Sequence, residues 1–392
     1  MISPSLKTLG MLMVVGALIA LSLAILFTEG RKHRKPCKMP KIRRYYIQAE
    51  TIEWDYAPTG MDNFMGMELP AIHHKKPNQI GTKYLKAKYV EYTDETFTTK
   101  KHQPADMGIL GPVIRGVVGE QLRILFRNKL PFPASIHPHG VLYDKASEGA
   151  GYVEKPGGPF VSPNSGDAVM PGEEFEYVFN VPERAGPLTG NPLSSIAWMY
   201  HSHAMDEPKE TQAGLIGFIV ITRKGKAKKN GAPKDVDREF FVMPKIFDEQ
   251  TSGFLEQNIL KYLNDTGKLT DAQFQSFKNG AIRASNQKDS INGYIFINNP
   301  GIRMCEGERV RWYAGTIGAF DLHPVHWHGI VGSEDGVRRV DTVFVAPGIA
   351  RVLDTEADNP GSWLFHCHID GHMMDGMVDI FHIDKCKKKS RE

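Results

Sequence analysis

The sequence predicts an all-β chain with two related domains that follow an N-terminal hydrophobic segment. Three observations support this prediction: many short segments rich in β-branched and aromatic residues, an internal repeat of four motifs, and no βαβ rhythm. The chain has 392 residues, 41% of them hydrophobic, which is long enough for two domains and too apolar for a disordered protein. Short strands without regular intervening helices indicate a β-sandwich or a small barrel in each half.

The composition excludes several classes of protein. Lys and Arg number 48 against 45 Asp and Glu, so a net charge of +3 gives no reason to expect nucleic acid as a partner. Four cysteines are too few for a disulfide-dense scaffold, and no two of them have the C-x2-C spacing of a zinc ribbon. Ten of the 15 histidines fall in four short clusters, which makes metal chemistry the leading hypothesis.

The first 44 residues are a separate segment. Residues 8–28 carry no charge and have an apolar core, which predicts a signal sequence or a membrane anchor. Ser22 and Ala24 offer a small-x-small cleavage site, whereas the basic residues of 31–44 would normally stay on the cytoplasmic side. Cleaved signal and retained anchor both stay open, as does the role of Cys37. We expect a secreted, periplasmic or extracellular-facing, membrane-anchored protein.

The remaining chain is predicted to consist mainly of strands. Short segments bounded by Gly, Pro, Asp or Asn predict strands at 117–126, 174–181, 215–222, 239–243, 309–313 and 378–383. One helix is expected at 251–263, and the lysine-rich, glycine-punctuated 223–234 predicts a linker. The expected organisation is an N-terminal segment 1–44, a first domain 45–225, a linker 226–234, a second domain 235–386 and a basic tail 387–392.

The two halves of the chain repeat the same motifs in the same order. The pairs are Gly119-Glu120-Gln121-Leu122-Arg123 with Gly307-Glu308-Arg309-Val310-Arg311, His137-Pro138-His139-Gly140 with His326-Trp327-His328-Gly329, Pro171-Gly172 with Pro347-Gly348, and Trp198-x2-His201-x-His203 with Trp363-x2-His366-x-His368. Two copies of one β domain, each of about 150 to 180 residues, follow from this repeat.

The histidine pairs carry the chemistry. A His-x-His pair on a strand points both side chains to one face, because side chains alternate with a period of two. Four such pairs at repeat-related positions offer eight imidazoles, which suit copper, zinc or iron and do not by themselves select the metal.

Cys367 selects copper. It lies inside the fourth pair, with His372 five residues and Met377 ten residues beyond it, and His323 lies three residues before the third pair. Two histidines, one cysteine and an axial thioether are the ligand set of a blue electron-transfer copper. Because both neighbours of Cys367 belong to the eight-histidine set, electrons have a short covalent route between two sites. Eight histidines can hold three coppers, enough with the first copper to deliver four electrons to O2.

These motifs, in this order, resemble the multicopper oxidases over roughly residues 45–386. In detail the chain looks most like one domain pair of the ceruloplasmin and hephaestin group, for example in Asp237-Arg238-Glu239-Phe240, Ile291-Asn292-Gly293 and Trp312-Tyr313. The resemblance implies two cupredoxin-like Greek-key sandwich or barrel domains and four coppers per chain. It implies type 1 ligands His323, Cys367, His372 and Met377, type 2 ligands His137 and His326, and type 3 ligands His139, His201, His203, His328, His366 and His368.

The resemblance extends to further residues. Ser202 stands in the place of the cysteine in the first domain, so one type 1 site per chain is implied. Asp370 matches a carboxylate that relays protons to the oxygen site, although a solvated turn aspartate is an equal alternative. Cys305 and Cys386 match a disulfide of the related domains, which would need an oxidising compartment.

Assembly and substrate are further expectations. Each domain supplies half of the cluster ligands, so we expect a homotrimer with clusters between subunits, as in the two-domain laccases; the alternative is a monomer with an internal cluster. Expected partners are O2 and a small reducing substrate, with no nucleic acid. The favoured prediction for the reaction is laccase-like oxidation of phenols or aromatic amines, and the alternative is oxidation of Fe(II) or Cu(I). At the positions of the relatives' iron ligands only Asp289 could bind a cation, while Glu334, Asp335 and Asp370 are candidates for another site.

Two other classes are less well supported by the sequence. A copper nitrite reductase needs its cysteine in the first domain and fewer cluster histidines, which Ser202 and the full set of eight oppose. A non-catalytic binding protein with the same fold is opposed by the intact ligand sets.

Overall fold

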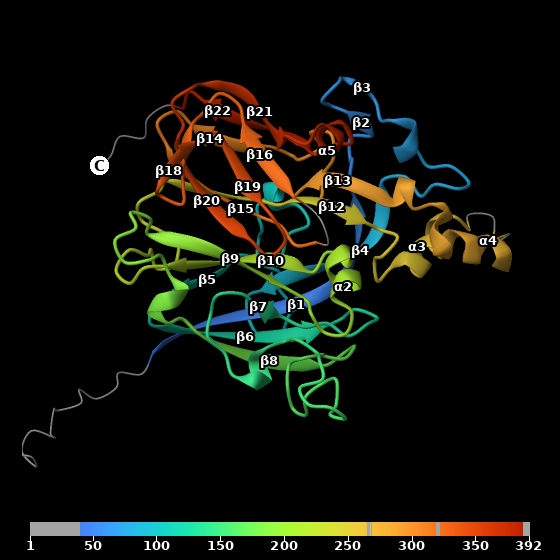
Figure 1. The fold of residues 1–392 in the computed structure, drawn as a ribbon, viewed down its shortest axis with the longest axis horizontal. Coiled ribbons are helices and arrows are strands. Elements are labelled where there is room, and N and C mark those ends of the chain that lie inside the picture. Colours follow the sequence, from blue (N-terminus) through green and yellow to red (C-terminus); the bar gives the residue numbers. More distant parts are fainter. Residues whose placement is uncertain (1–39, 265–266, 268, 319–321, 387–392) are drawn as a thin grey trace, which may run out of the picture. The chain divides into compact units, whose positions relative to one another are not determined.

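The computed structural model describes residues 40–264, 267, 269–318 and 322–386. The predicted hydrophobic segment, Cys37 and the basic tail lie outside the described residues. Within the described ranges, no helix is both long and apolar enough to cross a membrane. Figure 1 shows most of the strands in two groups, one coloured mainly blue to green and the other yellow to red. The predicted all-β class is confirmed.

The first domain consists of two four-stranded sheets. One has the order β4 (Lys83–Tyr92), β1 (Lys41–Asp55), β6 (Glu120–Asn128), β8 (Glu174–Asn180), and the other β5 (Ile114–Val117), β10 (Ile216–Thr222), β9 (Ser195–His201), β7 (His137–Pro138). Along β6 the side chains alternate between buried and half-buried, as expected of a strand with one face on a core. In contrast, every residue of β10 is buried.

The second domain consists of two five-stranded sheets. Their orders are β11 (Arg238–Val242), β15 (Arg309–Gly315), β20 (Ala350–Glu356), β17 (Gly332–Glu334), β18 (Arg338–Val340), and β14 (Ile302–Cys305), β22 (Val378–Asp384), β21 (Gly361–Cys367), β16 (His323–Trp327), β19 (Thr342–Val345). Two smaller pairs join β12 (Pro244–Asp248) to β13 (Gln287–Ile291) and β2 (Met61–Asp62) to β3 (Met67–Glu68). The short helices are α2 (Glu207–Ala213), α3 (Leu255–Tyr262), α4 (Asp271–Ser276) and α5 (Asp370–Met374).

An apolar core lies between the two domains. Met199 and Phe218 of the first domain and Tyr313 of the second belong to one cluster of buried side chains. Inside this cluster the Tyr313 hydroxyl lies 2.7 Å from Oγ of Ser195, and Nη1 of Arg311 donates to the same oxygen at 2.8 Å. Burial of this apolar surface, with its polar groups paired, holds the two domains against each other.

Most predicted strands agree with the structure to within two residues at each end, and two predicted elements differ by more. The strand predicted at 117–126 is two strands, because Gly119 adopts a φ of 90° between the end of β5 and the start of β6. The helix predicted at 251–263 begins at Leu255, since the preceding residues form hydrogen-bonded turns such as Thr251 N to Asp248 O at 3.0 Å. The segment predicted as a linker forms no strand, and Thr222 Oγ1 donates to Gly231 O there at 2.8 Å.

The disulfide implied by the resemblance is present. Cys305 and Cys386 are bonded, with their Cα atoms 5.4 Å apart and a sequence separation of 81. The bond joins the end of β14 to the residues that follow β22, the strand with which β14 pairs in parallel. Closing so long a loop restricts the unfolded chain, an effect of about 4 kcal/mol in the chain-entropy model.

Candidate metal centre

Four histidines gather at the edge of the first domain. His137 of β7 pairs directly with His201 of β9, and His139 and His203 follow the ends of these strands. Neighbouring imidazole rings are 5.4–5.9 Å apart between centroids, and Nε2 of His139 lies 3.3 Å from Nε2 of His201. We call these residues the first histidine group.

The second domain repeats this arrangement. His326 of β16 pairs with His366 of β21, and His328 and His368 follow the strand ends. Their ring centroids are 4.8–5.7 Å apart, and Nε2 of His328 lies 3.0 Å from Nε2 of His366. In both groups only the first member of each pair lies on a strand. The expectation that both members share a strand is therefore corrected, because each pair sits at a strand end.

A glycine and a tryptophan explain the rest of the repeated motif. Gly140 and Gly329 have φ values of 76° and 70°. A Cβ atom at Gly140 would lie 2.2 Å from the Trp198 ring, and one at Gly329 would lie 2.5 Å from the Trp363 ring. The chain therefore turns sharply after the first His-x-His pair of each domain, because glycine tolerates a positive φ and leaves room for the indole of the neighbouring strand.

Hydrogen bonds to the backbone orient several of the imidazoles. Nδ1 of His201 lies 3.0 Å from O of Ser202, and Nδ1 of His366 lies 2.9 Å from O of Cys367. Nδ1 of His137 lies 2.7 Å from a further carbonyl oxygen, that of Glu148. If each Nδ1 carries the proton and donates to the carbonyl, Nε2 is left with a free lone pair for a metal ion.

Burial keeps these rings neutral. Burial lowers the pKa of His139 to about 4 and that of His201 to about 3, with smaller contributions from neighbouring histidines. The pKa values of His137, His328 and His366 are lowered for the same primary reason. A neutral imidazole is the form that binds a metal, so the site is prepared for ligation at neutral pH.

A third cluster contains the cysteine. Sγ of Cys367 lies 3.7 Å from Nδ1 of His323 and 3.6 Å from Nδ1 of His372, and the three ligand atoms lie within 4.8 Å of one another. Ligands roughly 2.0–2.3 Å from one metal ion lie about 3.5 Å from each other, so this spacing fits a single ion. Met377 is fully buried, and its carbonyl accepts a hydrogen bond from N of Cys367 at 3.1 Å.

Burial also decides the protonation of this cluster. It lowers the pKa of His323 to about 3 and raises the pKa of the Cys367 thiol to about 11. Two histidines and a cysteine, with the buried Met377 hydrogen-bonded to the cysteine through the backbone, fit copper, which would have to displace the thiol proton.

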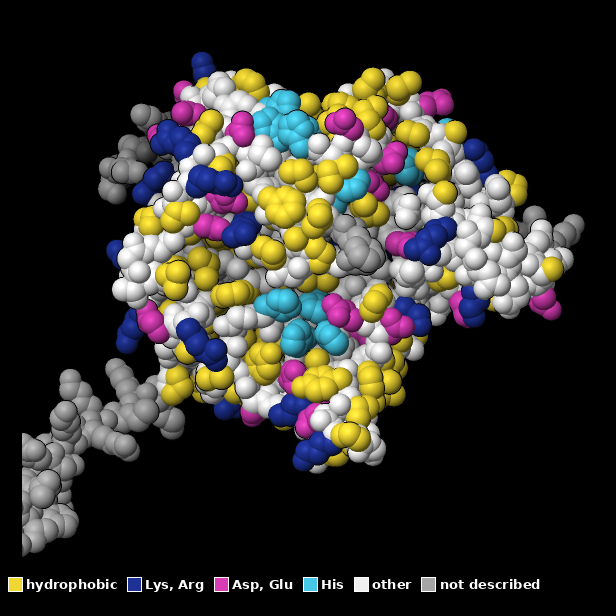
Figure 2. Space-filling model, viewed as in Figure 1, with side chains coloured by type: hydrophobic (Ala, Val, Ile, Leu, Met, Phe, Trp, Pro, Cys, Tyr) yellow, Lys and Arg dark blue, Asp and Glu magenta, His cyan; other side chains and the backbone are white. Residues whose placement is uncertain are grey.

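The two histidine groups are separate within the chain. They lie in different sheets, and among the described residues no hydrogen bond or ring contact joins them. Figure 2 shows histidine side chains in separate patches on one face, with hydrophobic side chains between them. The first group lines a cavity of about 300 Å³ together with Glu207 and with Ile317, Gly318, Pro347 and Gly348 of the second domain.

Comparisons with known proteins agree with this geometry. Two family models, both described as multicopper oxidase, match residues 86–226 and 268–385, which together are more than half of the chain. The chain belongs to the multicopper oxidase family. Membership implies copper as the metal, and it confirms the resemblance inferred from the histidine and cysteine motifs.

Several curated multicopper oxidase relatives share more than a third of their aligned residues with the chain. Ferroxidase HEPHL1 of Homo sapiens is 36% identical over 88% of this chain, hephaestin of Mus musculus is 37% identical over 86%, and ceruloplasmin of Homo sapiens is 35% identical over 90%. The chain covers only 30%, 28% and 33% of these proteins, respectively, so it spans about a third of their length.

Solved structures support the fold. A multicopper oxidase structure matches with a TM-score of 0.53 and 19% identity, covering 88% of this chain and 89% of the other. A copper nitrite reductase of Nitrosomonas europaea matches with a TM-score of 0.55 and 15% identity, covering 88% and 94%. At these identities the likeness concerns the fold alone, and it agrees with two cupredoxin-like domains.

One predicted residue lies away from the histidine groups, and one neighbour was missed. Asp370 is exposed in the first turn of α5, two residues before His372. Glu207, at the start of α2, has Oε2 only 3.1 Å from Nε2 of His203 and Oε1 3.7 Å from Nδ1 of His201. The only sequence signal for Glu207 is its position four residues after His203, at the start of a helix that was not predicted.

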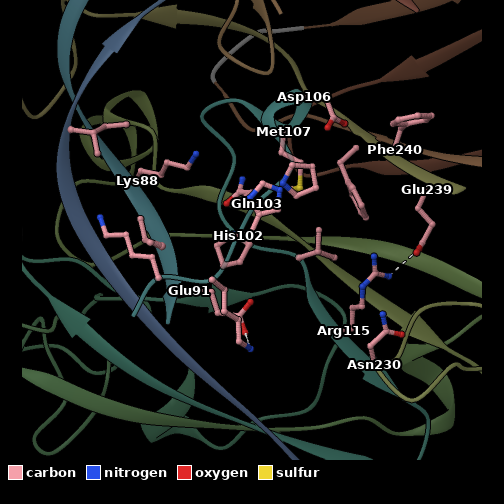
Figure 3. A pocket seen from close by; sticks show the side chains of 18 of the residues that line it. Lys88, Glu91, His102, Gln103, Asp106, Met107, Arg115, Asn230, Glu239 and Phe240 are labelled. Carbon is pink, nitrogen blue, oxygen red and sulfur yellow. Dashed lines mark hydrogen bonds and ion pairs between the residues drawn. The ribbon is translucent and has the colours of Figure 1, made fainter. Parts of the chain in front are cut away.

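A larger cavity of this multicopper oxidase lies elsewhere. It has a volume of about 950 Å³ and runs between the two domains, and none of the predicted copper ligands lines it. Figure 3 shows Lys88 and His102 on one side and Phe240 on the other, near the 2.9 Å ion pair of Arg115 with Glu239. Its charged groups are largely paired, which makes this cavity less suited to hold a metal ion than the three histidine clusters.

Proposed function

We propose that this chain is an oxidase that couples one-electron oxidation of a metal ion, Fe(II) in the first instance, to four-electron reduction of O2 to water. One observation carries the proposal. Cys367 makes a three-ligand cluster with His323 and His372. Its peptide neighbours, His366 and His368, belong with His326 and His328 to the second histidine group, the four clustered histidines of the second domain. A site that accepts single electrons is thus covalently joined to a site with several imidazoles.

The proposed ligand roles follow the clusters. Four coppers per chain would be held as type 1 by His323, Cys367, His372 and Met377, as type 2 by His137 and His326, and as a type 3 pair by His139, His201, His203, His328, His366 and His368. Bound copper would supply the one-electron redox chemistry and the site of O2 reduction. The protein contributes neutral, pre-oriented imidazoles and a buried thiol. Asp370 is proposed only as a surface carboxylate near the type 1 cluster.

The proposed substrate is a metal ion. It replaces the phenols and aromatic amines that were predicted first from the sequence. A relative that is named a ferroxidase supports this change. Cys367 and His323 are fully buried, whereas His372 is partly exposed on α5 and is flanked by the exposed Asp370 and Asp375. Electrons would enter through His372, and two carboxylates beside it would attract a cation more than a neutral phenol.

The other carboxylates suggested by the sequence are less suitable for iron. Glu334 pairs with Arg338 at 2.7 Å, and Asp335 pairs with Arg351 at 3.0 Å. A cation would have to displace an arginine from each of them, which supports the α5 surface as the place of oxidation.

Oxygen uptake by the copper-loaded full chain tests the proposal. Fe(II), Cu(I) and a phenol are compared side by side, with the metal-free protein and Cys367→Ser as controls for spontaneous oxidation. We expect Fe(II) to react fastest, with four Fe(II) consumed per O2. The double change Asp370→Asn/Asp375→Asn should raise the KM for Fe(II) severalfold and leave the phenol rate unchanged. A phenol rate above that of Fe(II) would restore the laccase-like alternative.

We further propose that the chain works as a homotrimer. Each histidine group holds half of the cluster ligands, and the absence of contact between the groups in the described residues supports completion by another subunit. Head-to-tail contacts that close form a ring. Gel filtration with light scattering should give three times the chain mass. A monomer that keeps the absorption of a type 3 pair would contradict this assembly.

A further inference from the structure

The first domain has a serine where the second has its copper cysteine. Ser202 lies between His201 and His203 just as Cys367 lies between His366 and His368. In the second domain a type 1 copper would tie the cysteine, and with it both flanking histidines, to His323 and His372. The first domain needs some other means of fixing its His-x-His pair.

Glu210 of α2 occupies this role in the structure. Its side chain is 3% exposed. Oε2 accepts hydrogen bonds from Oγ of Ser202 at 2.5 Å and from N of Ala204 at 2.8 Å. Oε1 accepts from N of Met205 and N of Asp206, both at 2.8 Å. One buried carboxylate therefore holds the chain on both sides of His203.

A second serine extends the network to the other histidine pair. Oγ of Ser202 accepts a hydrogen bond from N of Ser135 at 2.9 Å. Oγ of Ser135 accepts from N of His203 at 2.9 Å and donates to O of Gly149 at 2.6 Å. Ser135 lies two residues before His137, so the same network fixes both strands that carry the first histidine group.

We propose that Glu210 is the positioning residue of the first histidine group and replaces, in the first domain, the organising role that the type 1 metal has in the second. The inference rests on the proposed copper ligands. In the described part of the chain Glu210 makes no hydrogen bond or ion pair with an imidazole; it acts by fixing the backbone of residues 202–206. Loss of its charge would leave buried N–H groups without acceptors, and the segment would have to move to satisfy them.

Copper loading of variants tests this role. Glu210→Gln keeps the shape but turns one acceptor into a donor that faces N–H and O–H groups. The matched control is Glu50→Gln, another buried carboxylate of the first domain, which accepts from Gln48 Nε2 at 2.9 Å and Lys100 Nζ at 2.6 Å and contacts no histidine of either group. Ser202→Ala removes two hydrogen bonds, the one that Ser202 donates to Glu210 and the one that it accepts from N of Ser135, but leaves the three backbone hydrogen bonds of Glu210, and it provides a milder variant.

The readout is the ratio of type 3 to type 1 absorption as free copper is varied with a chelating buffer. The type 1 band reports the second domain and serves as an internal standard. We expect the affinity of the cluster to fall roughly 10- to 100-fold in Glu210→Gln and less in Ser202→Ala, since groups that orient metal ligands have effects of this size. Type 1 affinity should be unchanged in both, and Glu50→Gln should keep the wild-type ratio.

Two outcomes would overturn the inference in different ways. A wild-type ratio in Glu210→Gln, with lowered stability like that of Glu50→Gln, would reduce Glu210 to a structural residue while the proposed function stands. Wild-type protein that binds type 1 copper but no type 3 pair at any copper concentration would remove the proposed function and this inference together.

Discussion

Asp379 lies two residues beyond Met377 and is a buried acid. It is 1% exposed, Oδ1 accepts a hydrogen bond from N of Ile380 at 2.8 Å, and Oδ2 has no partner in the described part of the chain. Burial raises its pKa to about 8. In the folded protein at pH 7 this group therefore holds a proton that the unfolded chain gives up near pH 4.

This difference makes stability fall as pH rises. Between about pH 4 and pH 8 the native state binds more protons than the unfolded state, so the free energy of unfolding decreases by up to ~1.4 kcal/mol per pH unit. Asp379→Asn removes the titration, and we expect it to raise the free energy of unfolding by about 2–3 kcal/mol at pH 7. Denaturant titrations of metal-free protein at pH 5, 6, 7 and 8 measure this. The exposed Asp375→Asn is the control, and parallel pH profiles for both variants would contradict the prediction.

The Cys367 thiol gives a second prediction at this scale. Its pKa of about 11 means that copper must displace a proton throughout the neutral range, whereas His323, with a pKa of about 3, binds without proton competition. The type 1 affinity should therefore rise roughly tenfold per pH unit between pH 7.5 and 9.5. A chelator competition followed by the blue band measures this slope, with Asp370→Asn as control. A slope near zero would mean that the thiol is already ionised in the metal-free site.

At the scale of elements, the sequence predicted strands better than strand ends. The alternating burial of β6 follows from its pattern of apolar residues, but the turn at Gly119 lies inside a continuous β-like run. The His-x-His pairs were assigned to strands, yet each pair straddles a strand end, and in the two pairs that precede Gly140 and Gly329 the glycine turns the chain. Where a strand ends depends on such contacts across the sheet, which a local pattern does not contain.

The contact of Gly329 with Trp363 can be tested against a matched glycine. Gly307 has a φ of 82° and nothing within 4 Å of an added Cβ, whereas a Cβ at Gly329 would lie 2.5 Å from the indole. Both changes to alanine incur the left-handed backbone cost of about 1 kcal/mol. Gly329→Ala should lose a further 1–3 kcal/mol, roughly, from overpacking. It should also weaken type 3 absorption, because His328 and the strand of His366 must shift. Equal effects of the two changes on thermal unfolding and copper loading would refute the steric argument.

At the scale of the whole molecule, spacing predicted which histidines gather in each domain, because the repeat places equivalent side chains at equivalent strand ends. The roles of Glu207 and Glu210 could not be predicted, since both act from α2, and only the packing of this helix brings them against the first histidine group. The separation of the two groups follows from the packing of the domains through their shared apolar core. This separation makes the proposed trimer the condition for a complete cluster.

Complementation between inactive variants tests that condition. His139→Ala damages only the first histidine group and His328→Ala only the second. In a head-to-tail ring, a cluster forms where the intact first group of a His328→Ala chain meets the intact second group of a His139→Ala chain. Random mixing in a ring of identical contacts restores roughly a quarter of the clusters. Co-expressed chains with different tags should therefore recover about this fraction of wild-type oxygen uptake and type 3 absorption, with the type 1 band unchanged.

The control is His139→Ala with His201→Ala, which both lack the first group and cannot complement each other. An intrachain cluster predicts no recovery for either mixture, so activity in the first mixture alone would require that the active site is shared between subunits.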